Sequence, residues 1–338
     1  MQEQGLYDTF GRKHNYLRIS LTDACNLRCT YCMPDEKVIV TPSHKMMQVD
    51  EIVEIAKVFV SLGVNKIRLT GGEPLVRKDA KLIIQQLAKL PVELSISTNA
   101  VLVNEFIEDF KQANIRSVNV SLDTLNADDF LKITKRGEFE KIKQNLFLLV
   151  KEGFKVKLNM VVMKGINENA ILDFIELTKD FALDARFIEF MPFSGNDWNR
   201  EKVFTQTEML QLIQTKYNVL KLEDELNDTA KKYKVPGHKG NFGFISTVSN
   251  PFCNTCNRLR LTADGKMKNC LFSEGETDLL NAYRNGINIE PLIIENLQAK
   301  KQALGGRFDF ENIENRSMIK IGVKTKPLIM HNKFPLRR

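Results

Sequence analysis

Three cysteines lie close together near the start of the sequence, at Cys25, Cys29 and Cys32. Their CxxxCxxC spacing directly follows an apolar run at residues 17–21. Neighbouring thiolates can share one metal centre, and soft sulfur ligands select zinc, copper(I) or iron–sulfur clusters. Structural zinc prefers four ligands, whereas three thiolates on a [4Fe–4S] cluster leave one iron open to a small molecule. The first cysteine group therefore favours a cluster with an open iron.

The remaining cysteines, Cys253, Cys256 and Cys270, form a second group of three. Asp264 and Gly265 stand between two short strand-like runs, which predicts a hairpin turn. Folding this hairpin returns Cys270 toward Cys256. The second group could therefore also share one cluster.

Zinc is the alternative in both places, because a histidine could supply a fourth ligand. His14 and His44 are near the first group, although neither has a finger-like spacing, and His238 is a possible fourth ligand for the second group. Buried free thiols are a further alternative. A disulfide framework is not expected, because secreted frameworks scatter their cysteines more widely and a reducing cytosol favours metal sites.

The chain between the two groups alternates strand and helix signals, which predicts a parallel sheet with crossover helices. Such a sheet could be doubly wound or curl into a barrel. The expected strands are residues 17–21, 66–70, 92–97, 117–122, 155–162 and 185–190, and the expected helices are 50–63, 78–90, 104–113, 138–152 and 168–181. Beyond them we expect a helix at 203–217, a charged irregular segment at 223–240 and a strand at 242–248.

The first cysteine loop, with Tyr31 before its last cysteine, resembles the cluster loop of radical S-adenosylmethionine (SAM) enzymes. That resemblance implies an incomplete (βα)6 TIM-type barrel, in which chemistry gathers at the carboxyl ends of the strands. Short polar motifs do lie at or just past the ends of the expected strands: Gly71-Gly72-Glu73-Pro74, Thr98-Asn99, Ser121-Leu122-Asp123 and Glu189-Phe190-Met191.

With the second cysteine group and Arg258-Leu259-Arg260 after it, residues 8–321 resemble the GTP 3′,8-cyclase (MoaA) family of molybdenum cofactor biosynthesis. Further matching segments begin at Asp8, Tyr16, Arg68, Asn119 and Arg186. The resemblance implies a partial barrel over residues 1–191, an extension over 192–322 with a second cluster and the GTP site, and a basic tail over 323–338.

The family's activity is implied as follows. An open iron of the first [4Fe–4S] cluster binds SAM, and one electron cleaves it to a 5′-deoxyadenosyl radical. This radical takes hydrogen from C3′ of GTP, and the C3′ radical attacks guanine C8. The product is (8S)-3′,8-cyclo-7,8-dihydroguanosine 5′-triphosphate.

The resemblance also implies roles for individual residues. The cluster ligands would be Cys25, Cys29 and Cys32 for the first cluster and Cys253, Cys256 and Cys270 for the second, whose open iron would bind guanine. SAM would contact Tyr31, Gly72, Ser121 and Met191, and GTP would contact Arg18, Arg68, Ser97, Lys157, Arg258, Leu259 and Arg260. Glycine permits close main-chain approach, and the planar fork of arginine suits phosphate oxygens.

The net charge is +7, with a pI near 8.9. Five of these charges lie in the tail at 323–338, so the body is only mildly basic, which suits a phosphorylated small ligand better than nucleic acid. No signal peptide is recognised, and no apolar run approaches the roughly 18 residues of a membrane span. We therefore expect a cytoplasmic enzyme without a nucleic-acid or membrane partner.

The family resemblance implies a protein that reduces the cluster and transfer of the product to cyclic pyranopterin monophosphate synthase. A homodimer is compatible with the sequence. One departure stands out: the family's chain ends in Gly-Gly, whereas Val323 follows Gly322 here and fifteen residues come after it. The role of the tail is therefore open.

Two other readings compete with the GTP cyclase. A radical SAM enzyme acting on a peptide would cleave SAM without depending on GTP. A non-catalytic zinc protein would bind nucleic acid with an affinity that falls steeply with salt.

Overall fold

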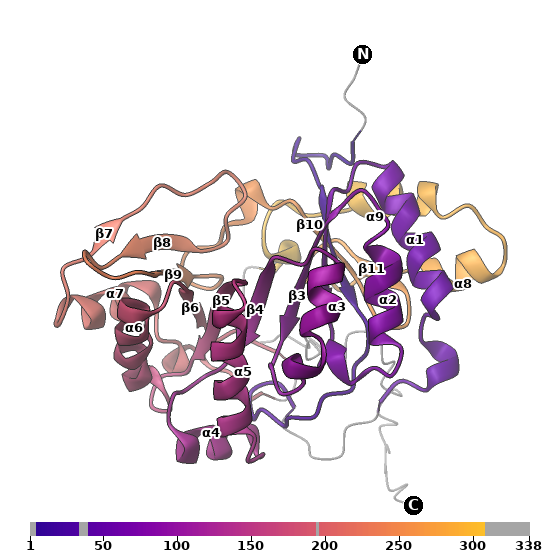
Figure 1. Ribbon diagram of the computed structural model, residues 1–338. Coiled ribbons are helices and arrows are strands. Elements are labelled where there is room, and N and C mark those ends of the chain that lie inside the picture. The colour runs from indigo at the N-terminus through magenta and orange to yellow at the C-terminus, as the bar shows by residue number, and fades with distance from the viewer. Residues whose placement is uncertain (1–4, 34–39, 194–195, 308–338) are drawn as a thin grey trace, which may run out of the picture.

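The computed structural model describes residues 5–33, 40–193 and 196–307. The predictions for Gly322, Val323 and the basic tail lie outside these residues. The described strands form one sheet of twelve in the order β12-β11-β10-β1-β2-β3-β4-β5-β6-β9-β8-β7 (Figure 1). Their bounds are β1 Tyr16–Ser20, β2 Lys66–Thr70, β3 Glu93–Thr98, β4 Ser117–Ser121, β5 Lys155–Val162, β6 Asp184–Glu189, β7 Leu220–Lys221, β8 Lys231–Lys234, β9 Asn241–Ile245, β10 Arg258–Leu261, β11 Lys266–Lys268 and β12 Thr277–Asp278.

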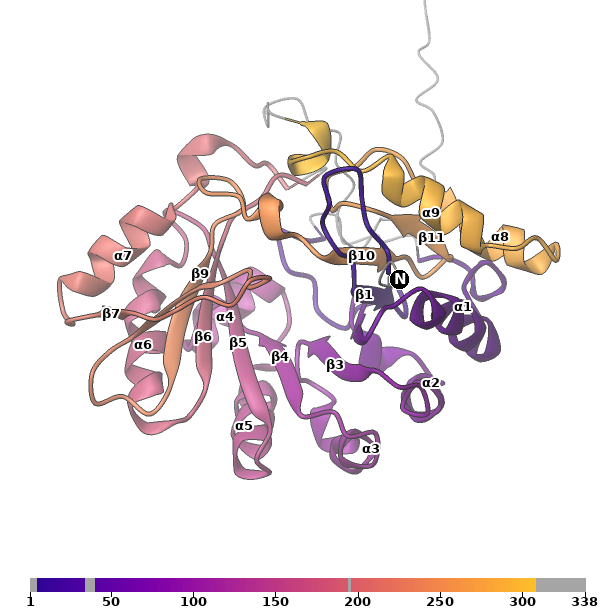
Figure 2. The same ribbon diagram turned by 90° about the horizontal axis from the view of Figure 1, so that it is seen from above.

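Strands β1 to β6 run parallel to one another, and each begins and ends within one residue of its expected position. The helices are α1 Val49–Ser61, α2 Ala80–Leu87, α3 Ile107–Gln112, α4 Ala127–Thr134, α5 Phe139–Lys151, α6 Ile171–Asp180, α7 Gln206–Gln214, α8 Leu279–Arg284 and α9 Glu290–Gln298. Seen from above, the strands form an arc with α1, α2, α3, α5 and α6 on its convex side (Figure 2). The expected incomplete barrel is confirmed, and the doubly wound alternative, which needs helices on both faces, is wrong.

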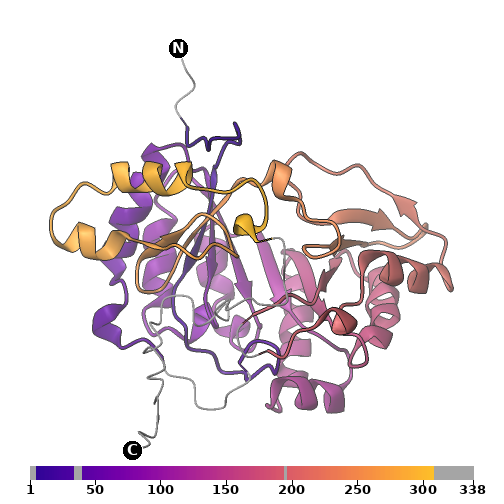
Figure 3. The same cartoon turned by 180° about the vertical axis from the view of Figure 1, so that it is seen from behind.

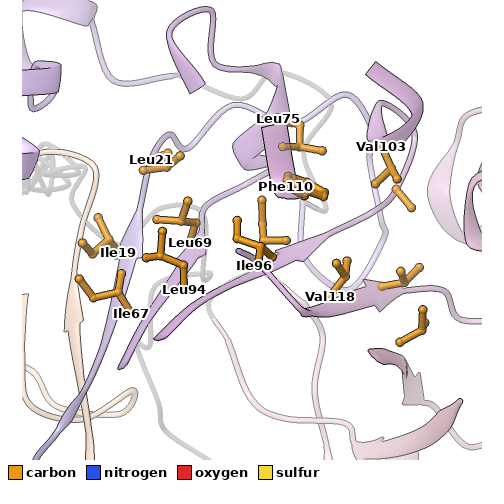
Figure 4. Packing of buried hydrophobic residues seen from close by; sticks show 14 of the residues in the cluster. Ile19, Leu21, Ile67, Leu69, Leu75, Leu94, Ile96, Val103, Phe110 and Val118 are labelled. Carbon is orange, nitrogen blue, oxygen red and sulfur yellow. The ribbon is translucent and has the colours of Figure 1, made fainter. Parts of the chain in front are cut away.

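The core lies between the strands and the outer helices. Successive side chains on a strand point to opposite faces, and here the apolar ones point outward. Ile19, Ile67 and Leu69 pack with Ile96 and with Phe110 of α3 in this layer (Figure 4). The polar side chains on the same strands are therefore left to face the inside of the arc.

The C-terminal extension adds strands to both ends of the parallel sheet. Strand β10 pairs with β1 and β9 pairs with β6, both in parallel. β10 and β11 form the antiparallel hairpin expected around Gly265, whose φ of 69° is the left-handed conformation that favours glycine. The orange and yellow C-terminal elements lie on the side that the outer helices leave uncovered (Figure 3). The domain boundary after residue 191 stays a prediction.

Several elements were not expected from the sequence. They are α4, the β7–β8 hairpin within the charged segment, and the elements β12, α8 and α9 near the end of the described chain. Helix α7 is shorter than the predicted helix at 203–217. Among the described residues, no helix has the length and apolar character needed to cross a membrane.

Candidate active site

A cavity of about 390 Å³ lies on the inner side of the arc and is lined by both cysteine groups. Most of the site residues expected from the sequence meet there, although they come from segments as distant in the sequence as Arg18 and Cys270. Those that line it are Arg18, Cys25, Cys29, Tyr31, Cys32, Arg68, Gly72, Ser97, Ser121, Met191, Cys253, Cys256, Arg258, Arg260 and Cys270.

Two expected GTP contacts, Lys157 and Leu259, are not among the lining residues. The Leu259 side chain is fully buried in the apolar core, because it alternates on β10 with Arg258 and Arg260. Only its main chain is left for a ligand. Lys157 lies in register with the lining residue Asn119 of the neighbouring strand β4. Both contacts stay predictions.

The first cysteine loop is supported by helix α4. The amides of Arg28 and Thr30 donate to the carbonyl oxygens of Thr134 and Ile133, at 2.9 Å each. These carbonyls lie in the last turn of α4, where they have no partner within the helix. The unexpected helix therefore helps to hold the loop that carries Cys25, Cys29 and Cys32.

The loop also touches the end of β2 at Gly72. The Gly72 amide donates to the Thr22 carbonyl at 2.7 Å, and the Glu73 amide donates to the Ala24 carbonyl at 2.8 Å. A Cβ at position 72 would lie 2.3 Å from the Ala24 oxygen. This position therefore requires glycine because the two main chains approach each other so closely.

Tyr31 and Asp123 form a buried pair beside the first cysteine group. The Tyr31 hydroxyl donates to Asp123 Oδ2 at 2.8 Å, and the Val161 amide donates to Oδ1 at 2.9 Å. Burial raises the pKa of Asp123 to about 6. This network joins the cysteine loop to the ends of β4 and β5.

The second cysteine group is gathered by the hairpin, as the sequence predicted. Cys253 and Cys256 flank a single short turn, in which the Cys256 amide donates to the Cys253 carbonyl at 3.1 Å. Cys270 follows β11. Strand β11 pairs with β10, which begins two residues after Cys256. Arg258 reaches the Cys256 sulfur through Nη2 at 3.6 Å.

Positive charge dominates the wall of the cavity. Five arginines line it against two carboxyl groups, Glu73 and Asp123. Burial, together with the neighbouring charges of Arg18 and Arg258, lowers the pKa of Arg260 to about 9. Cations so close together and so little solvated favour a polyanionic ligand, which would offset their repulsion.

The electrostatic surroundings of the two cysteine groups differ. Burial raises the pKa of Cys25 to about 11 and of Cys32 to about 12. Burial also raises the pKa of Cys256, but Arg258 and Lys300 outweigh it and lower that pKa to about 6. The Cys256 thiol therefore lies in a more cationic setting than the Cys25 and Cys32 thiols.

Three further polar residues line the cavity but were not predicted as site residues. Arg186 of β6 and Asn159 of β5 are adjacent in register, and Asn119 lies on β4. The Oδ1 atoms of both asparagines are buried and have no partner among the described residues. Strict alternation with buried apolar neighbours was the signal that could have found them.

Each three-cysteine group has the donor chemistry that an iron–sulfur cluster requires. All six cysteines are free thiols. Within each group the thiols act on one another's pKa, as expected for neighbouring sulfurs: Cys25 and Cys32 on Cys29, and Cys256 and Cys270 on Cys253. Three thiolates and an adjoining cavity match a cluster with one iron open to a ligand.

Comparisons with known families agree with this site. Residues 19–178 match the Radical SAM superfamily, and residues 183–305 match Molybdenum Cofactor Synthesis C. The chain is therefore a radical SAM protein with a C-terminal region of the molybdenum cofactor synthesis type. The superfamily implies a [4Fe–4S] cluster and SAM.

Relatives identify the family within this class. The chain is 40% identical to the GTP 3′,8-cyclase of Peptoclostridium acidaminophilum over 94% of its own length and 98% of the relative. It is 43% identical to the mitochondrial GTP 3′,8-cyclase of Arabidopsis thaliana over 94% of its own length and 83% of the relative. It belongs to the family of these GTP 3′,8-cyclases.

The same family includes longer proteins. Molybdenum cofactor biosynthesis protein 1 of Dictyostelium discoideum is 45% identical over 95% of this chain and 52% of the relative. The chain thus spans about half the length of the first curated relatives it matches. Among solved structures, Streptococcus suis SuiB bound to S-adenosylmethionine has a TM-score of 0.58 at 14% identity, covering 80% of this chain and 65% of SuiB. This likeness concerns the fold alone.

Proposed function

We propose that this chain is a GTP 3′,8-cyclase that performs the first step of molybdenum cofactor biosynthesis. The observation that carries the proposal is the single cavity lined by two three-cysteine groups with arginines on its wall. Relatives that the chain covers almost completely bear the name of this activity.

At one end of the cavity, Cys25, Cys29 and Cys32 would hold the first cluster, and its open iron would bind SAM. When bound, the cluster and SAM supply a carbon radical that can take a hydrogen atom from a ribose. The main chain at Gly72 would lie against SAM, and Tyr31, Ser121 and Met191 would orient it. The protein's task here is to fix the cofactor and keep water out.

At the other end, Cys253, Cys256 and Cys270 would hold a second cluster, and its open iron would bind the guanine of GTP. The triphosphate would lie against Arg18, Arg68, Arg258 and Arg260, with Lys157, Ser97 and the Leu259 main chain nearby. To this set the geometry adds Arg186, because it faces the same cavity. Arginine forks bind phosphate oxygens with two parallel hydrogen bonds.

In this arrangement, the chain's own residues position C3′ of GTP between the two ends. The cations hold the triphosphate and thereby fix the ribose. A protein reductant, transfer of the product to cyclic pyranopterin monophosphate synthase, a cytoplasmic location and a homodimer belong to the same proposal.

The test is an anaerobic assay of the reconstituted chain with SAM, a reductant and either GTP or ATP. We expect 5′-deoxyadenosine together with a cyclised nucleotide from GTP and no cyclised product from ATP. If SAM is cleaved equally well without GTP and no cyclised nucleotide forms, the proposal fails and the peptide alternative gains support.

A further inference from the structure

Lys300 follows helix α9 and is buried, with only 4% of the residue exposed. Lysine is almost never fully buried without a partner. Its Nζ donates to the Asn269 carbonyl at 2.7 Å, to the Arg258 carbonyl at 3.3 Å and to the Cys256 sulfur at 3.6 Å. An ammonium has three donors, so each of its N–H groups has a partner.

These three contacts join the segments that carry the second cysteine group. Asn269 directly precedes Cys270, and Arg258 lies two residues after Cys256. The Lys300 ammonium therefore links the chain on both sides of the β10–β11 hairpin. The Asn269 side chain adds a second link, donating through Nδ2 to the Asn296 carbonyl of α9 at 2.7 Å.

The charge of Lys300 is matched by sulfur rather than by a carboxylate. In the described part of the chain, no Asp or Glu makes an ion pair with it. Burial lowers the pKa of Lys300, Cys256 and Cys270 act in the opposite direction because their thiolates would favour the ammonium, and Arg12 and Arg258 lower the pKa further. A buried cation is costly unless an anion faces it. A thiolate-bound cluster would be that anion.

Among the described residues, no cation donates a hydrogen bond to a sulfur of the first cysteine group; Arg28 acts on the Cys25 thiol but donates to the Cys25 carbonyl instead. The Cys25 sulfur accepts from the Leu27 amide at 3.4 Å and from Asn99 Nδ2 at 3.8 Å, and both donors are neutral. The carboxyl groups of Glu73 and Asp123 lie in the same part of the cavity. Net charge and hydrogen bonds to sulfur set the potential of an iron–sulfur cluster.

We propose that Lys300 is a positioning residue of the second cluster, which holds the Cys256 and Cys270 segments together and raises the reduction potential of the cluster between them. This inference rests on the proposed function. Reduction adds a negative charge, and a cation hydrogen-bonded to the cluster sulfur stabilises the reduced form.

The test compares Lys300→Met with Lys301→Met. Methionine keeps the length of the side chain but removes the charge and the donors. The neighbouring Lys301 side chain is exposed, so its variant matches the charge change without the contact. A full-length background with Cys25, Cys29 and Cys32 replaced by alanine isolates the second cluster, whose potential is then measured by an EPR-monitored redox titration.

In Lys300→Met we expect the equilibrium constant for reduction of the second cluster to fall at least tenfold, which lowers its reduction potential by about 59 mV for one electron. The reduction potential of the second cluster in Lys301→Met should equal that of the parent. An unchanged or higher potential in Lys300→Met, with the cluster intact, overturns the inference. A parent chain with an intact first group that binds only about four irons instead of about eight refutes the second cluster and hence the proposed function itself.

If Lys300→Met loses the cluster or does not fold, the contact is tested in the background that lacks Cys25, Cys29 and Cys32 but keeps Lys300. We expect pulsed EPR of the reduced chain labelled with ¹⁵N-lysine to show a ¹⁵N coupling that is absent from Lys300→Arg labelled in the same way. Without a lysine coupling in the parent, the contact does not exist and the inference fails.

Discussion

Replacing Gly72 by alanine should displace the first cysteine loop. The new Cβ would lie 2.3 Å from the Ala24 carbonyl oxygen and 2.8 Å from that of Asp23, well inside normal contact distance. Both obstacles are main-chain atoms, so a side-chain rotation cannot relieve the overlap. The loop must therefore move away from β2.

The loss of folding free energy in Gly72→Ala can be estimated from the contacts that hold the first cysteine loop in place. Two main-chain hydrogen bonds, from Gly72 to Thr22 and from Glu73 to Ala24, join it to β2. Each is worth about 0.5–1.5 kcal/mol net, and forcing extra volume into packed structure costs about 1–3 kcal/mol. Together the free energy of unfolding should fall by about 2–6 kcal/mol.

The assay combines chemical denaturation of the apo chain with SAM binding to the reconstituted chain. Gly137→Ala is the matched control, because a Cβ there meets no atom within 4 Å and the backbone φ is ordinary. We expect Gly72→Ala to be destabilised as above and to bind SAM at least about tenfold more weakly, which is about 1.4 kcal/mol. If both variants behave like the parent, the close approach at Gly72 has no energetic consequence and the reasoning is refuted.

Three further predictions concern the GTP end of the cavity. Cys270→Ala should retain some uncoupled SAM cleavage, measured as 5′-deoxyadenosine, but form no cyclised nucleotide; full product from this variant would defeat the second-cluster assignment. Arg260→Ala should weaken GTP binding by about 1.5–3 kcal/mol in calorimetry, the range for a hydrogen bond to a charged group, and an unchanged affinity would count against the triphosphate role. Burial, with Arg186 and Arg68, lowers the pKa of Lys157 to about 8. A triphosphate beside it would raise that pKa, so GTP affinity should fall as pH rises through 8, and Lys157→Met should lose this pH dependence; an equal slope in both proteins would exclude the contact.

The sequence predicted the parts of the fold that depend on local pattern. Strand positions followed from alternation and apolar runs, and the β10–β11 turn followed from Asp264 and Gly265. The same alternation puts Arg258 and Arg260 on one face of β10, and it could also have placed the Leu259 side chain in the core.

The parts that the sequence did not predict depend on partners distant in the chain. Strand β8 is rich in lysine, yet Lys232 pairs with Asp228 at 2.6 Å and Tyr233 stacks on Phe242 of the next strand. Helix α4 is only eight residues long, although Asn126 caps it by accepting from the amides of Asp128 and Asp129. This cap was a usable signal.

The role of Lys300 at the site was likewise not predictable from the sequence. In the sequence it is the first of two lysines after a helix, and nothing local separates it from Lys301. Only the packing of α9 against β11 brings its ammonium to Cys256. Contacts of this kind need the tertiary structure.

The central claim is that one cavity brings a SAM-derived radical to the ribose of GTP. The most direct measurement supplies GTP deuterated at C3′ to the reconstituted chain with SAM and a reductant, and determines deuterium in the 5′-deoxyadenosine by mass spectrometry. The account predicts that one deuterium is transferred for each cyclised nucleotide. Abundant 5′-deoxyadenosine without deuterium would contradict it.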